Sequence, residues 1–236
     1  MKALEDVLPT AERDRIRQRC LARPGWYSPW LHLGITSLSG IAFFALGVAL
    51  VHDVKAWQLG FAGLIFVVSN ATEWRLHRDV LHKRNRGPAA VLYDRHTPEH
   101  HVIYTTDDME IRERSEFRLV LIPWFGILGV ALLTLPATLA LWVAGQPNLA
   151  GLFMATTMLY VVSYEWLHLS YHLPARSFIG RMRVIGWLRR THAVHHDPRL
   201  MQRWNFNVTL PLWDVVRRTY VTDRDAALAA RQQRKA

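Results

Sequence analysis

The sequence predicts an all-α membrane protein in which four transmembrane helices form two hairpins and carry a cytoplasmic helical cap. Three observations predict this class. Half of the 236 residues are hydrophobic, and they gather in four runs close to the ~20 residues that cross a bilayer. Short linkers join the runs in pairs. The basic residues lie almost entirely outside both the runs and the linkers.

The four runs have no charged residue in their interiors, apart from Glu165 at the end of the last one. They extend over residues 30–51, 57–71, 119–144 and 149–167. The linkers within the pairs, residues 52–56 and 145–148, are so short that the helices they join must be antiparallel neighbours. Each pair is therefore predicted to form a helical hairpin, with both tips on the same side of the membrane.

The distribution of basic residues predicts the orientation. Segments 1–29, 75–118 and 168–236 contain 6, 9 and 13 of the 29 Lys and Arg residues, and the tips contain only Lys55. Because positive residues accumulate in cytoplasmic loops, these segments and both termini are predicted to be cytoplasmic, in a multi-pass protein of a bacterial inner membrane. Anionic lipid head groups then account for the net charge of +10, so no nucleic acid is expected as a partner.

The chain is predicted to divide into three parts. Residues 1–29 form an N-terminal cytoplasmic or interfacial segment, residues 30–223 an integral-membrane domain, and residues 224–236 a tail that is a frayed helix or disordered. Thr10 is predicted to cap a short arginine-rich helix, which either contacts lipid phosphates or is solvated. The lone Cys20 excludes an internal disulfide, a thiolate metal site and an iron–sulfur cluster.

Ten of the twelve histidines lie in four motifs on the predicted cytoplasmic side. The motifs are His77-x4-His82, His96-x3-His100-His101, His168-x3-His172 and His192-x2-His195-His196. Neutral imidazole is a common metal ligand, and ten imidazoles exceed what one structural metal needs. The cap is therefore predicted to hold a dimetal site. His32 and His52 are not expected to bind metal, since one begins the first run and the other lies on the opposite side.

The spacings predict how the histidines point. Residues i, i+3 and i+4 of an α-helix share a face, and the third and fourth motifs fit this spacing. His77 and His82 diverge by roughly 140° on an ideal helix, so they require a helix end between them or serve two different metals. Adjacent histidines, such as His100 and His101, diverge by about 100°. This divergence suits two neighbouring metals with one histidine directed to each.

Polar residues beside the motifs are predicted to support the ligands. A ligating imidazole usually donates its second N–H to a carboxylate or a carbonyl. The candidate supporting acids are Glu73, Glu165, Asp94 and Asp197, and Asn205 is a candidate for a further polar contact. An all-nitrogen site suits Zn, Cu, Fe or Ni. The His-Glu-x-x-His string of a zinc protease does not occur, whereas two irons with open positions could activate O2 beside lipid.

The motifs, in this order and at these positions relative to the runs, resemble the fatty acid hydroxylase/sterol desaturase superfamily of membrane di-iron enzymes. The resemblance covers roughly residues 60–220. EWRLHRDVLH (73–82), Tyr164-Glu165 before His168, RLVLIPW (118–124) and NFNVTLPLWDVVRRT (205–219) resemble the fatty acid 2-hydroxylase type. Sterol desaturases tend to open with His-x3-His, and bacterial carotenoid hydroxylases tend to use His-x4-His third. This chain does neither, which favours an acyl-lipid substrate.

The resemblance implies an oxidoreductase that uses two iron ions and O2 to hydroxylate a C–H bond of an acyl chain or related lipid. The ten histidines would hold the irons, no further catalytic residue is implied, and such sites also accept zinc. A separate electron donor of the ferredoxin or cytochrome b5 type is expected at the basic face. That face includes Arg84, Arg86, Arg189, Arg190, Arg217 and Arg218. Candidate substrate-lining residues are Trp166, Tyr171, Trp187, Trp204, Phe206 and Trp213.

Three alternatives stay open from the sequence. A desaturase, or a sterol- or carotenoid-type oxidase, belongs to the same superfamily and would use the same metals. A membrane metal transporter would place histidines and acids within the hydrophobic runs as a pathway, and these runs are nearly free of both. A non-catalytic dimetal protein would keep the histidines for stability alone.

Overall fold

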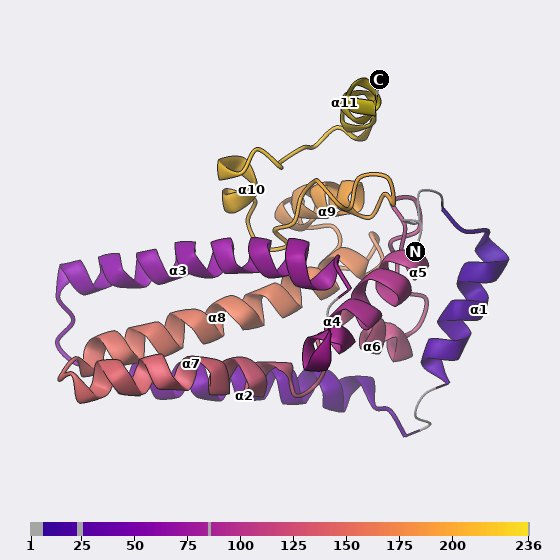
Figure 1. Ribbon diagram of the computed structural model, residues 1–236. Helices are drawn as coiled ribbons and strands as arrows, with labels where there is room; N and C mark the ends of the chain where they lie inside the picture. The colour runs from indigo at the N-terminus through magenta and orange to yellow at the C-terminus, as the bar shows by residue number, and fades with distance from the viewer. Residues whose placement is uncertain (1–6, 23–25, 85, 236) are drawn as a thin grey trace.

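The computed structural model describes residues 7–22, 26–84 and 86–235 (Figure 1). The regular elements of this described part are all helical, which confirms the all-α class; Thr105 and Asp108 form one isolated bridge. Four long helices run side by side, and shorter helices gather at one end of them (Figure 1). We call that end the head; it consists of the described residues within 7–22, 77–123 and 173–235.

The long helices pair into two hairpins whose connecting turns lie at the end far from the head (Figure 1). They are α2 (Pro29–Ala49), α3 (Ala56–Leu76), α7 (Gly126–Val143) and α8 (Pro147–His172). Helix α8 contacts the other three. Helices α2 and α8 approach closely at Gly47 and Gly151, where a Cβ added to Gly151 would lie 2.5 Å from the Gly47 carbonyl oxygen. Only glycine permits this approach.

Two of these helices, α2 and α7, are long and apolar enough to cross a membrane. Helices α3 and α8 correspond to the second and fourth predicted spans, but polar side chains lower their hydrophobicity. In α3 these include Gln58, Asn70 and Glu73, which are all buried within the protein.

The third predicted span is wrong in its first part. Residues 119–144 do not form one helix, because the short helix α6 (Phe117–Val120) ends before Pro123 and α7 begins at Gly126. Leu119, Val120 and Leu121 are buried in a hydrophobic core of the head. Their hydrophobicity thus serves packing inside the protein.

The head is built from short elements between and after the hairpins. These are α1 (Thr10–Leu21), η1 (His77–Leu81), η2 (Gly87–Ala89), α4 (Ala90–Arg95), η3 (His96–His100), α5 (His101–Ile103), η4 (Arg114–Glu116), α6, α9 (Arg183–His195), α10 (Leu212–Val216) and α11 (Arg224–Lys235). Every histidine motif lies in the head or at the adjoining end of α8. The fold therefore brings sequence-distant motifs to one end of the bundle.

Helix α1 is docked on the head, and two of its arginines are neither lipid-facing nor solvated. Pro9, and not Thr10, occupies the N-cap position. Arg13 donates to the Ile103 carbonyl at 3.2 Å and pairs with Asp108 at 3.0 Å. Arg17 forms an ion pair with Glu116 at 3.3 Å, and both side chains are almost fully buried.

Replacement of Arg17 by alanine should lower the free energy of unfolding by about 3–5 kcal/mol, because it leaves the Glu116 carboxylate buried without its cation. Arg15→Ala on the exposed face of the same helix is the matched control and should change stability by less than about 0.5 kcal/mol. Thermal unfolding of both variants in detergent measures the difference. Equal melting temperatures would show that the buried ion pair does not anchor α1.

Helix α11 packs against the head, whereas the sequence predicts a frayed helix or a disordered tail there. Helix α11 places Ala227 in a hydrophobic cluster with Val194 and Leu200. Arg224 donates to the buried carboxylate of Asp197 at 2.7 Å. Helix α11 therefore packs against the end of the fourth histidine motif.

Candidate metal centre

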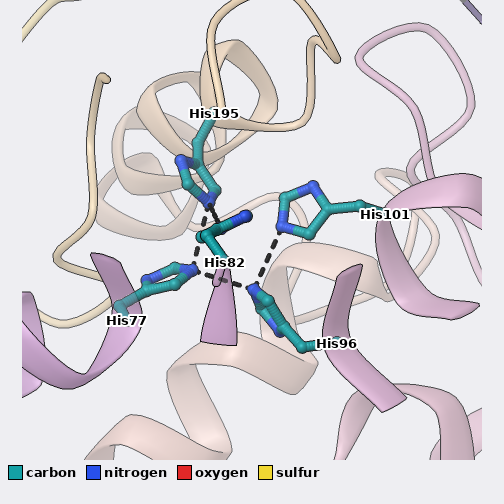
Figure 2. Close-up of side chains that lie close together, drawn as sticks. All are labelled: His77, His82, His96, His101 and His195. Atoms are coloured by element: carbon teal, nitrogen blue, oxygen red, sulfur yellow. Dashed lines mark hydrogen bonds between the residues drawn. The ribbon is translucent and has the colours of Figure 1, made fainter. Parts of the chain in front are cut away.

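The ten histidines of the four motifs converge in two buried groups. Within each group the candidate ligand nitrogens all lie within 4.8 Å of one another. The first histidine group is His77, His82, His96, His101 and His195 (Figure 2). The second histidine group is His100, His168, His172, His192 and His196. His32 and His52 belong to neither group.

Two π-helical turns explain how histidines five residues apart reach the same group. Segments η1 and η3 are π-helical, and the His82 N–H donates to the His77 carbonyl at 3.2 Å. The wider turn brings residues i and i+5 onto one face. The rings of His77 and His82 stack with centroids 5.0 Å apart, so the helix end or divergence expected from the sequence is not needed. His96 and His101 are likewise placed in the same group.

Adjacent histidines separate between the two groups, as the spacing predicts. His101 and His195 belong to the first histidine group, whereas their neighbours His100 and His196 belong to the second. Each of the two HisHis pairs therefore contributes one histidine to each group.

Backbone carbonyls, and not the expected carboxylates, orient half of these rings. The Nδ1–H groups donate to carbonyl oxygens at 2.7–2.9 Å in four cases: His100 to Leu119, His172 to Met109, His195 to Trp204, and His196 to Tyr104. His77 donates to Phe206 in the same way. Each such bond fixes the tautomer, so the Nε2 atom carries a lone pair.

The resulting lone pairs face one another, and this arrangement fits bound metal. Nε2 of His195 lies 3.0 Å from Nε2 of His77, although both rings use their only proton on a carbonyl. Two lone pairs at that separation repel unless a cation lies between them. In the second histidine group, Nε2 of His100 and of His172 is buried with no hydrogen-bond partner. Buried polar atoms without partners are rare, and a bound metal ion would satisfy both of these.

Glu73 accepts hydrogen bonds from the loop that contains Val208 and Thr209, and not from a histidine. Its carboxylate accepts from the Thr209 backbone N–H at 3.1 Å and the Thr209 hydroxyl at 2.6 Å, and also from Val208 and Tyr160. That loop continues from Phe206, whose carbonyl orients His77. Glu73 therefore acts on His77 through the backbone.

Three of the other four predicted supporting residues, Glu165, Asn205 and Asp197, form hydrogen bonds with groups other than the histidines. Glu165 accepts from the Ile122 N–H at 3.1 Å, Asp94 is exposed, and Asn205 donates to the Thr191 and Val221 carbonyls. Burial alone would raise the pKa of Asp197, but hydrogen bonds from Arg199 and Arg224 lower it to about 2. An ionised Asp197 thus holds α11 against the end of the fourth motif.

A small cavity of about 50 Å³ reaches both histidine groups. His96 of the first group and His100 and His168 of the second form part of its wall. Apart from Arg95, the remaining wall is apolar or aromatic: Leu81, Leu92, Leu119, Val120, Leu121, Ile122, Pro123 and Tyr164. A largely apolar wall beside candidate metal ligands favours contact with hydrocarbon over contact with polar groups.

A family model described as fatty acid hydroxylase matches residues 62–219, which is most of the chain and includes all ten histidines. The chain belongs to the fatty acid hydroxylase family. This membership makes it an oxidoreductase of a membrane-associated family, and the two histidine groups agree with the metal use of that family. A search of curated proteins and a search of solved structures gave no match.

None of the six aromatic residues expected to bind a fatty acid hydroxylase substrate lines this cavity. Phe206 packs against His195 with ring centroids 5.6 Å apart, and Tyr171 against His192 at 5.4 Å. Trp166 is 41% exposed and donates to Ser37, and Trp187, Trp204 and Trp213 are half-buried. The stretch around Leu119–Pro123 forms part of the cavity wall, but its hydrophobicity is also that of a membrane span, so the sequence does not identify it as part of the site.

Acid should destabilise the metal-free protein between pH 6.5 and about 4. Burial lowers the pKa of His77 from 6.5 to about 4, so in this window the unfolded state binds a proton that the folded state does not. Stability therefore falls as the pH decreases through the window, by about 3 kcal/mol for His77 alone. Chemical unfolding of metal-free protein at pH 7.5, 6, 5 and 4 measures it. Constant stability over this range would contradict neutral buried imidazoles.

Proposed function

We propose that this protein is an O2-dependent hydroxylase of acyl chains or related lipids, with one iron held by each histidine group. The observation that carries the proposal is the shared cavity. Its wall contains ligand candidates from both groups, and the rest of it is largely apolar. A hydrocarbon segment in this space would contact both metals at once.

The residues of the chain would have three tasks in this reaction. The ten histidines hold the irons, and the carbonyls of Phe206, Trp204 and Tyr104 keep imidazole rings of both groups in the ligating orientation. Bound iron would supply the activation of O2 with two external electrons and the oxidation of an unactivated C–H bond. The apolar wall, including Leu92 and Leu121, would orient one carbon and exclude water.

The proposed location is a bacterial inner membrane, with α2, α3, α7 and α8 as four spans and the head in the cytoplasm. Residues 30–223 form the membrane domain in this proposal. The excess of Lys and Arg on the head side supports this orientation. The buried polar residues of α3 would then face the protein and not lipid, as polar groups in membrane helices do.

The electrons would come from a separate protein, of the ferredoxin or cytochrome b5 type. Arg84, Arg86, Arg190 and Arg217 are exposed on the head and would attract an acidic donor. Arg189 is half-buried and pairs with Glu110 at 3.1 Å. High ionic strength should therefore slow reduction by the donor more than reduction by dithionite.

Anaerobic purification with ferrous iron, followed by metal analysis and single turnover with O2, tests the proposal. The expected results are about two irons per chain and an acyl product heavier by one oxygen. A product lighter by two hydrogens would identify a desaturase instead. Iron-free protein that still forms the product would rule out the proposed chemistry. Transport of Fe2+ or Zn2+ by proteoliposomes without lipid oxidation would favour a transporter.

A further inference from the structure

Tyr104 lies against the second histidine group and has no part in the proposed ligand set. It is fully buried. Its ring centroid lies 4.7 Å from that of His172 and 5.3 Å from that of His100. Its carbonyl accepts from His196 at 2.7 Å. Three of the five histidines in the group therefore contact this one tyrosine.

The Tyr104 hydroxyl faces a buried carboxylate. It donates to Glu116 Oε2 at 2.6 Å. Oε1 of Glu116 accepts from the Arg17 guanidinium at 3.3 Å and from the Arg112 backbone N–H at 3.1 Å. Glu116 is only 1% exposed, so its strongest available proton source is the phenol of Tyr104.

A second buried tyrosine provides an internal comparison. Tyr171 is also fully buried, and its ring lies 5.4 Å from that of His192 in the same histidine group. Its hydroxyl donates to the Val208 carbonyl at 2.7 Å. An amide carbonyl accepts a hydrogen bond but takes up a proton only in strong acid, whereas a carboxylate does so readily. The two tyrosines thus share burial and proximity but differ in their proton acceptor.

We propose that Tyr104 is a redox-active residue that gives one electron to the oxidised metal centre and its phenolic proton to Glu116 when no substrate fills the cavity. This inference rests on the proposed function, because the O2-oxidised centre is the oxidant. The phenolic O–H bond breaks and an O–H bond forms on Glu116. Tyr104 becomes a neutral radical, and the centre is reduced by one electron. An electron from the external donor and the proton returned from Glu116 then restore the Tyr104 phenol, and Glu116 is again a carboxylate.

The surroundings of Tyr104 favour this coupled transfer. Loss of the electron alone would leave a cation radical in a buried site, where an unpaired charge is costly. Proton transfer along the existing hydrogen bond avoids that charge. Arg17 loses the charge of Glu116 but remains 3.9 Å from Asp108. The function of the step is to discharge an oxidised centre that has no C–H bond to attack, and so to protect the ligating histidines.

Electron paramagnetic resonance on iron-loaded, reduced protein mixed with O2 without substrate tests the inference. The expected result is a free-radical signal in freeze-quenched samples that narrows when the protein contains ring-deuterated tyrosine. Tyr104→Phe keeps the ring and the carbonyl, and should abolish the signal. Tyr171→Phe is the matched control and should leave it unchanged. A bound lipid substrate should suppress it.

Glu116→Gln separates proton acceptance from hydrogen bonding, since glutamine can accept the hydrogen bond but not the proton. It should slow radical formation by about 100-fold, as loss of a positioned base does. Unaltered radical kinetics in this variant, or no tyrosine radical in the wild-type protein at any reaction time, would overturn the inference. A wild-type protein that binds iron and oxidises lipid, but forms no tyrosine radical when it reacts with O2 in the absence of substrate, would refute the inference alone. Failure to bind iron would refute the proposed function.

Discussion

Replacement of His195 by alanine should remove the metal of the first histidine group and abolish lipid oxidation. Its Nε2 lies 2.9 Å from that of His82 and 3.0 Å from that of His77, so its loss opens the centre of the group. Changes to the outer partners of metal ligands already cost about 10–100-fold in affinity or activity. Loss of a ligand should therefore exceed about 100-fold. Metal analysis and mass spectrometry of cell lipids measure the two effects.

The control for this prediction is His52→Ala. His52 is exposed at the hairpin end far from the head and should leave both metal content and product unchanged. His172→Ala should reproduce the loss of activity by emptying the second histidine group. Full activity with normal metal content in either variant would show that the replaced histidine is not an essential metal ligand.

Leu92→Trp should fill the cavity and reduce product formation by about 100-fold, an effect typical of displacing a reacting carbon by about 1 Å. Leu92 is half-buried and lines the cavity, so the larger ring enters a space of about 50 Å³. Both metals should remain bound, because Leu92 contributes no ligand atom.

The neighbouring substitution Val91→Trp is the matched control, since Val91 is 42% exposed and outside the cavity wall. It should retain activity within about twofold, as surface changes generally have small effects. Product formation by both variants is compared at equal iron content. Normal activity of Leu92→Trp would show that the substrate reaches the metals by another route.

The helical class, the two hairpins and the convergence of the histidine motifs could all be predicted from the sequence. Hydrophobic runs of helical length and short linkers require antiparallel pairs. Motifs that follow the same ends of those pairs must then meet, whatever the details of the head. Adjacent histidines such as His100 and His101 also predicted two histidine groups, because neighbouring residues on a helix point in different directions.

Other features depend on tertiary contacts that have no local signal. Leu119–Leu121 are as hydrophobic as a membrane span, and only the fold shows that they pack inside the head. Arg17 is buried because it forms an ion pair with Glu116, which is distant in sequence. The carbonyls that orient the histidines belong to the backbone, which every residue carries. Acidic side chains near the motifs therefore do not indicate which carbonyls orient the histidines.

The π-helical turns make the spacing of a histidine motif a poor guide to substrate. An i+5 pair in a π-turn and an i+4 pair in an α-turn both place the second side chain one turn after the first. A gap of one residue in an alignment of His77-x4-His82 with a His-x3-His motif can therefore be absorbed by local winding, with the same two ligands retained. The spacing of the first motif, His77-x4-His82, favours an acyl lipid over a sterol when only the sequence is considered. In the structure this spacing reflects the local winding of the helix and not the shape of the substrate. The cavity wall is the better discriminator when relatives with different substrates are compared.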